Sequence, residues 1–292
     1  MLADIDQALA LLKRRDQDSL EEALSLLQRS IFAFGMRVCG QRQDAEDTMQ
    51  EVLIKLLPYL RKFDNSKALA NWLYKVAKNR CLMSRRRSKF APKEELSLHE
   101  LMPDRRELEQ LDRLPESGPE DSAIRTERAQ RLREAVRRVP PEYRIILVLR
   151  DMEGFTDEEV SEVTGLRAGT VRVRLHRARL FVRKELAKED GVRGRARPSK
   201  SSRSAQSRIG GCRKMFAGLS DYLDGQLDDF SCEEIEAHLD SCEPCKKFLA
   251  SLEQSIKQCQ QFPAECPDAK RAAELSKKLL AAYGRALATA RK

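Results

Sequence analysis

Apolar residues recur at helical spacing along most of the chain. In the stretch DAEDTMQEVLIKLLPYL, for example, Val52, Leu53, Leu56, Leu57 and Leu60 fall on one face of a helix. Gly and Pro are sparse, and aromatic residues make up only 5% of the 292 residues. The pattern predicts an all-α protein, and its length favours two or three small domains over a single core.

A second pattern predicts two short helices joined by a glycine turn. Thr156 followed by Glu159 forms a capping box, which predicts that a helix begins at Asp157. Gly165 marks its end, and a second helix is expected from Ala168 or Gly169. The buried stripe expected for this second helix comprises Val171, Leu175 and Ala178.

Charge divides the chain more sharply than hydrophobicity does. The whole chain carries a net charge of +9. Residues 61–91 hold ten basic residues and one acidic residue, whereas residues 215–250 hold two basic and nine acidic residues. A helix C-terminus accounts for a few bases but not for ten, so residues 61–91 are expected to face phosphate.

The second helix of the glycine-turn pair is also basic, with seven basic residues and no acidic residue from Leu166 to Lys184. Two short helices of which the second is basic fit a DNA-reading helix-turn-helix. The alternative is a helical hairpin with a solvated basic face. His176 is expected to contact backbone or phosphate rather than a metal, because no other ligand residue lies near it in the sequence.

Cysteine usage points to metal or thiol chemistry in the C-terminal third. Six of the eight cysteines follow residue 211. The chain has no secretion signature and no apolar run of about 18 residues, so a cytoplasmic protein without membrane contact is expected. In that compartment thiols or metal ligands are more common than disulfides. Cys39 and Cys81 lie on apolar helix faces and are expected in the core.

The stretch EAHLDSCEPC sets His238, Cys242 and Cys245 at the spacing of a tetrahedral zinc site. His238 and Cys242 share one helix face, and Pro244 turns the chain so that Cys245 can return. The fourth ligand is Cys212 or Cys232, and Cys212 is favoured because Cys232 would point away. One zinc ion is therefore predicted.

Two cysteines near the C-terminus allow two interpretations. Cys259 and Cys266 flank the segment QQFPAE. They are either ordinary half-buried thiols or a second site for a thiophilic metal or for redox chemistry.

Residues 1–187 resemble the sigma-70 family, in its extracytoplasmic-function (ECF) group. DAEDTMQEVLIKLLPYLRKFDNSKALANWLYKVAKNRCLMSRRR resembles region 2 of that family, and PPEYRIILVLRDMEGFTDEEVSEVTGLRAGTVRVRLHRARLFVRKEL resembles region 4. The resemblance implies a non-enzymatic sigma factor that binds the RNA polymerase core enzyme and the −10 and −35 elements of promoter DNA. The loop FDNSKALANWL departs from the Gly- and Arg-containing loop common in the group, which bears on the −10 base preference.

The resemblance also implies roles for individual residues. Those implied to dock on the clamp helices of core polymerase are Asp47, Gln50 and Glu51. Those implied to contact the −10 element are Lys62, Asn65, Asn71, Lys75, Lys78, Asn79 and Arg80. Those implied at the −35 element are Arg167, Thr170, Arg172, Arg174, His176, Arg177 and Arg179.

The segment CRKMFAGLSDYLDGQLDDFSCEEIEAHLDSCEPCKKF resembles the zinc-binding anti-sigma domain, whose members bind sigma factors and in some cases release them on thiol oxidation or metal exchange. Because residues 215–250 are acidic and both predicted DNA-binding surfaces are basic, we expect an intramolecular contact between them. The alternatives are a purely structural zinc site and a segment without metal.

Six segments are therefore predicted. They are region 2 (1–91), an acidic linker (92–127), region 4 (128–187), a basic flexible linker (188–211), the zinc-binding anti-sigma-like domain (212–250) and a C-terminal helical tail (251–292). The rival function is a metal- or redox-sensing DNA-binding regulator that acts without core polymerase. An enzyme is disfavoured, because three dispersed histidines offer no catalytic arrangement and a four-ligand metal site has no open position.

Overall fold

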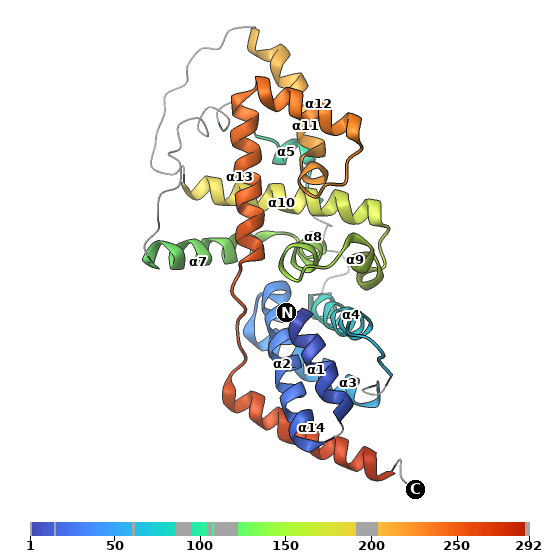
Figure 1. Ribbon diagram of the computed structural model, residues 1–292. Coiled ribbons are helices and arrows are strands. Elements are labelled where there is room, and N and C mark those ends of the chain that lie inside the picture. Colours follow the sequence, from blue (N-terminus) through green and yellow to red (C-terminus); the bar gives the residue numbers. More distant parts are fainter. Residues whose placement is uncertain are drawn as a thin grey trace. The chain divides into compact units, whose positions relative to one another are not determined.

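The computed structural model describes residues 2–14, 16–59, 62–85, 95–103, 107, 122–190 and 204–289, and its elements are all helical (Figure 1). The all-α prediction is confirmed. The helices are α1 (Leu2–Arg14), α2 (Gln17–Cys39), α3 (Arg42–Leu56), η1 (Leu57–Tyr59), α4 (Ser66–Arg85), α5 (Leu98–Leu101), α7 (Ser122–Arg138), α8 (Pro141–Leu147), η2 (Val148–Met152), α9 (Asp157–Thr164), α10 (Ala168–Asp190), α11 (Ser204–Leu223), α12 (Asp229–Ser241), α13 (Glu243–Gln260) and α14 (Ala269–Thr289).

The chain divides into two compact units. Unit 1 comprises Met1–Pro92, Val148–Ala168 and Pro263–Lys292, and unit 2 comprises Lys93–Leu147 and Gly169–Phe262. The division falls between residues 168 and 169, at the start of α10. The two helices of the predicted helix-turn-helix therefore belong to different units.

Unit 1 is built around α1 to α4. The side chain of Asp16 caps α2 by accepting a hydrogen bond from the Ser19 amide, and Gly40 ends α2 in the left-handed conformation at φ 76°. Val52, Leu53 and Leu56 of the predicted stripe are buried, whereas Leu60 lies outside the described residues. The last helix, α14, packs against α2 and α3 (Figure 1).

Cys39 and Cys81 correct the expectation that the cysteines are thiols or metal ligands. Both are buried, as predicted, but they form a disulfide between the end of α2 and α4. The sequence pattern placed each sulfur in the core without showing that two helices bring them together.

Unit 2 contains α10 and α13, and α13 crosses α10 (Figure 1). One apolar core includes Phe216 of α11, Ile235 of α12 and Phe248 of α13, and it also takes in Leu180 of α10 and Leu101 of α5. The C-terminal helices therefore share a hydrophobic core with the predicted DNA-reading helix, which favours their association by the usual burial of apolar surface.

The local predictions for the glycine-turn helices are confirmed. Thr156 and Glu159 form the predicted capping box, α9 begins at Asp157, and Gly165 ends it at φ 77°. α10 begins at Ala168, and Val171, Leu175 and Ala178 are fully or almost fully buried.

The two predicted linkers are described only in part. In the acidic linker, α5 lies at residues 98–101 and α7 begins at Ser122. In the basic linker, residues 191–203 lie outside the described residues, and so does the Arg-rich end of the region 2 stretch after residue 85. Within the described ranges, no helix combines the length and the apolar character needed to cross a bilayer.

Candidate metal centre and nucleic-acid interface

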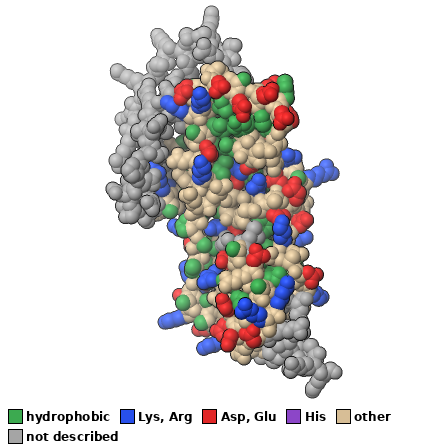
Figure 2. Space-filling model, viewed as in Figure 1, with side chains coloured by type: hydrophobic (Ala, Val, Ile, Leu, Met, Phe, Trp, Pro, Cys, Tyr) green, Lys and Arg blue, Asp and Glu red, His purple; other side chains and the backbone are tan. Residues whose placement is uncertain are grey.

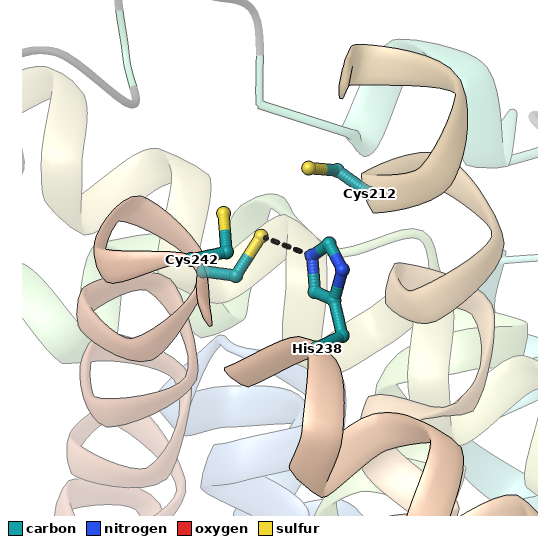
Figure 3. A group of neighbouring side chains, drawn as sticks. Cys212, His238 and Cys242 are labelled. Atoms are coloured by element: carbon teal, nitrogen blue, oxygen red, sulfur yellow. Dashed lines mark hydrogen bonds between the residues drawn. The ribbon is translucent and has the colours of Figure 1, made fainter. Parts of the chain in front are cut away.

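Three helices of unit 2 bring the predicted metal ligands together. Cys212 lies on α11, His238 on α12, Cys242 between α12 and α13, and Cys245 in the first turn of α13. The four ligand atoms lie within 4.8 Å of one another, and His238 Nε2 is 3.3 Å from Cys245 Sγ. Figure 3 shows Cys212, His238 and Cys242 pointing toward one centre.

The donor set fits a tetrahedral ion. In a zinc site, sulfur ligands about 2.3 Å from the metal are about 3.8 Å apart, which is compatible with the spacing of these four atoms. Burial raises the pKa of the Cys212 thiol, and burial followed by the neighbouring Cys242 and Cys212 raises the pKa of the Cys245 thiol. A cation offsets that cost, because it binds the thiolate form.

The local geometry corrects the expectation that His238 and Cys242 share one helix face. Cys242 does not extend the helix that carries His238, because α12 ends at Ser241 and Cys242 joins it to α13. Pro244 occupies the first turn of α13, where its missing amide costs nothing. Among the described residues the cluster includes Cys212 and not Cys232, which lies earlier on α12 and is half-buried.

The two remaining cysteines are not part of this cluster. Cys259 is buried near the end of α13, and Cys266 is exposed in the segment between α13 and α14.

The turn after α11 contacts the basic helix α10. Asp224 accepts two hydrogen bonds from Arg179, with Nη1 to Oδ2 at 2.7 Å and Nη2 to Oδ1 at 3.0 Å. The Arg179 side chain is only 2% exposed. A bidentate pair with this little exposure is a strong and directional contact.

Two further contacts extend this surface along α10. His176 Nδ1 is 2.8 Å from Ser220 Oγ of α11, and burial, followed by Arg179 and Arg177, lowers the pKa of His176 to about 4. Arg183 lies 3.9 Å above the ring of Phe248 of α13, and burial lowers its pKa to about 10.

The predicted −35 residues thus differ in accessibility. His176 and Arg179 are covered within unit 2. Arg172 is half-buried and donates to Gln226 at 3.4 Å, and Arg174 is 3.4 Å from Glu142. The remaining three are exposed or half-buried: Arg167, Thr170 and Arg177.

The predicted −10 residues gather on α4 and the loop before it, in unit 1. Asn65 caps α4 by accepting from the Ala68 amide at 2.8 Å, and Arg80 pairs with Glu51 at 2.8 Å. Lys78 is buried and donates to the Val163 carbonyl at 2.8 Å. Asn71 is half-buried, and four are exposed: Lys62, Asn65, Lys75 and Asn79.

Two of the three predicted polymerase-docking residues lie beside α14, whereas Glu51 pairs with Lys55 and with Arg80 of α4. Asp47 and Gln50 line a cavity of about 250 Å³ between α3 and α14, whose other wall includes Arg271 and Lys278. Arg271 forms an ion pair with Glu46, and Gln28 of α2 donates to Ser276 at 3.0 Å.

Sequence reasoning missed several of these partners. Asp224 was visible only as the first residue of an Asp-Gly turn, and Arg271 only as one base in a helical tail. Neither residue carries a local signal that identifies a partner 45 or 225 positions away.

Comparison with known families matches three parts of the chain. Residues 24–90 match the family described as "Sigma-70 region 2", residues 129–182 match "Sigma-70, region 4", and residues 219–246 match "Putative zinc-finger". The third match covers His238, Cys242 and Cys245 but begins after Cys212, so the placement of Cys212 rests on the structure.

Curated relatives agree with the first two matches. The ECF RNA polymerase sigma factor SigW of Bacillus subtilis (strain 168) is 27% identical over 60% of this chain and 92% of its own length. The RNA polymerase sigma factor SigV of the same strain is 30% identical over 51% of this chain and 80% of its own length. The ECF RNA polymerase sigma factor SigE of Mycolicibacterium smegmatis (strain ATCC 700084 / mc(2)155) is 32% identical over 54% of this chain and 58% of its own length.

Proposed function

Because this chain belongs to the sigma-70 family, as an ECF-type RNA polymerase sigma factor, we propose that its C-terminal helices hold it inactive in cis until the Cys/His cluster changes state. The family is non-enzymatic and acts in transcription initiation. In this proposal the metal is one zinc ion, the signal is metal or thiol redox state, and the site of action is the cytoplasm.

Residue roles follow from the family. Asp47, Gln50 and Glu51 dock on core polymerase, α4 and its preceding loop read and open the −10 element, and α10 enters the −35 major groove. Capture of an unstacked base offsets a few kcal/mol of unstacking, which suits promoter opening without nucleotide hydrolysis.

The observation that carries the proposal is the contact that α11 and the turn after it make with α10, through Ser220 and Asp224. This contact is called the cover over α10. Asp224 accepts hydrogen bonds from Arg179, and Ser220 contacts His176; both α10 residues are proposed to contact the −35 element in an active factor. Leu180 of α10 belongs to the apolar core of the C-terminal helices, so the contact is hydrophobic as well as ionic. DNA cannot reach these side chains while the cover is in place.

A second contact supports the same conclusion in unit 1. α14 packs on α2 and α3, pairs Arg271 with Glu46, and walls the cavity lined by Asp47 and Gln50. A polymerase helix that approached Asp47 and Gln50 would meet α14 there.

The Cys/His cluster is connected to the cover over α10 through helix α11. Cys212 lies on α11, and the same helix carries Ser220 and leads directly into Asp224. Cys212, His238, Cys242 and Cys245 would hold the ion and would thereby join α11 to α12 and α13. If the metal is lost or the thiols are oxidised, α11 is no longer held to α12 and α13 by shared ligands. It can then dissociate from α10.

Transcription with purified core polymerase tests this proposal on the full chain. We expect low promoter-dependent output from the metal-loaded protein and higher output after addition of a zinc chelator or peroxide. Output that is equal under all conditions contradicts cis control. Tight promoter binding without core polymerase would instead favour the DNA-binding regulator.

A further inference from the structure

Unit 1 contains a contact between α4 and a segment some eighty residues later in the chain. Residues 148–168, which include η2 and α9, belong to the same compact unit as the region 2 helices. The segment does not contain the Cys/His cluster, so its contact with α4 is separate from the cover over α10.

The segment is anchored by a buried carboxylate. Glu153 accepts from Arg37 Nη1 at 2.8 Å and from the Tyr74 hydroxyl at 2.6 Å. The side chains of Arg37 and Glu153 are 5% and 0% exposed. A buried ion pair with additional hydrogen bonds holds its partners in one geometry.

Aromatic packing surrounds this anchor. Tyr74 of α4 makes edge contacts with Phe34 of α2, at a centroid distance of 4.8 Å, and with Phe155, at 5.2 Å. Phe155 immediately precedes the cap of α9, so the anchor fixes where α9 begins.

From that anchor, α9 lies along α4 and presents carboxylates to it. Asn71 donates to Glu162 at 2.5 Å, and Lys67 lies 3.1 Å from Glu159. At the end of α9, Lys78 donates to the carbonyl oxygen of Val163. Desolvation, followed by the charge of Lys75, lowers the pKa of Lys78.

The groups that α9 supplies are those that DNA would supply. Phosphates offer α4 anionic oxygens that accept hydrogen bonds from lysine and asparagine. Glu159, Glu162 and the C-terminal carbonyls of α9 offer acceptor oxygens of partial or full negative charge to the same three side chains.

We propose that α9 acts as an internal mimic of the DNA backbone and covers part of the −10-reading face of α4, at Asn71 and Lys78, in the free factor. The proposal rests on the assignment of α4 to the −10 element, but not on control by the C-terminal domain. It adds a second role to a helix that the family places in region 4.

The contact itself is tested with a zero-length carbodiimide cross-linker on the full-length protein. Lys67 and Glu159 are close enough to form an amide, which mass spectrometry detects as a cross-linked peptide. We expect this peptide in the free protein and its loss when core polymerase and promoter DNA are added. Its absence from the free protein overturns the proposal, and so does its persistence in the promoter complex.

The mimicry is tested by DNA affinity. Glu159→Gln with Glu162→Gln removes two charges and keeps the capping box, because Gln also caps an N-terminus. The matched control is Asp6→Asn with Glu21→Gln, two exposed residues of α1 and α2 with the same change in net charge. The probe is a fluorescent single-stranded DNA of random sequence.

The α9 variant is expected to bind the probe about tenfold more tightly than the control variant at low salt. Equal affinities of the two variants overturn the mimicry. The assay contains no polymerase and does not alter the Cys/His cluster, so its failure is distinguishable from a failure of the proposed cis control.

Discussion

At the scale of single residues, the proposed cis inhibition depends on a buried pair between Asp224 and Arg179. Removing one partner of a buried pair leaves the other without its counter-charge, which typically costs about 3 to 5 kcal/mol. Asp224 is 16% exposed, so the loss is expected at or below the lower end of that range.

Asp224→Asn keeps the shape of the side chain and removes its charge. We expect hydrogen exchange of the backbone amides around Arg179 to accelerate by at least about tenfold, because the cover opens more often. The matched control is Glu233→Gln on the exposed face of α12, where acidic side chains are numerous. Figure 2 shows several acidic side chains on the part of unit 2 that carries α12. Equal exchange in the two variants would argue against the pair.

His176 predicts a pH dependence with a definite sign. Burial, followed by Arg179 and Arg177, lowers its pKa to about 4 in the folded chain, against about 6.5 when unfolded. Below about pH 6.5 the unfolded chain binds a proton that the native chain does not, so this contribution to stability is present above pH 6.5 and is lost as pH falls toward 4. The loss is at most about 1.4 kcal/mol per pH unit.

Urea unfolding of His176→Gln and of the parent protein isolates this contribution. The free-energy difference between about pH 7 and about pH 5 should be smaller in the variant. The exposed His99→Gln serves as the control. A parent protein and a His176 variant with the same pH slope would contradict the assignment.

At the scale of elements, α11 carries Cys212 of the predicted metal site and Ser220, which contacts the proposed DNA-reading helix α10. We expect the removal of one ligand to weaken both metal binding and the contact between α11 and α10. Cys212→Ser should reduce bound zinc below one ion per chain, measured by atomic absorption after dialysis, and should increase exchange of the α10 amides. Cys232→Ser, a half-buried residue outside the cluster, should leave zinc content unchanged. Equal metal content in the two variants would remove Cys212 from the site.

The docking of α14 gives a separate prediction in unit 1. Arg271→Glu places two carboxylates together at Glu46 and should release α14. We expect core polymerase to bind the variant about tenfold more tightly in a surface-binding assay, and Lys277→Glu on the exposed side of α14 to have no such effect. If Arg271→Glu binds no better than Lys277→Glu, α14 does not cover the polymerase site.

Helix boundaries and the Cys/His cluster were easier to predict from the sequence than the long-range pairs between individual residues. The capping box of Thr156 and Glu159 and the close sequence spacing of His238, Cys242 and Cys245 are local signals, and they correctly predicted the start of α9 and three members of the cluster. The pairs Asp224 with Arg179 and Glu153 with Arg37 join positions far apart in sequence, and a single charged residue on a helix has many possible partners. The disulfide between Cys39 and Cys81 was missed for the same reason, because a bridge requires a Cα separation that a sequence does not state.

At the scale of the whole molecule, the chain itself contacts both surfaces that are proposed to bind DNA and polymerase. α11 and α13 cover α10 in unit 2, and α9 and α14 cover the region 2 helices in unit 1. The acidic segment predicted to meet the basic surfaces does so at Arg179 through Asp224. The account therefore predicts a factor whose resting state is inactive.

The most direct measurement is promoter-dependent transcription by core polymerase with the full-length, zinc-loaded chain and its Asp224→Arg, Arg271→Glu double variant. The matched control is Glu233→Arg with Lys277→Glu, which makes the same changes of charge on exposed faces of α12 and α14. We expect the double variant to be active without chelator or oxidant, whereas the parent and the control need one of them. Equal activity of all three proteins, with zinc bound, would contradict cis inhibition.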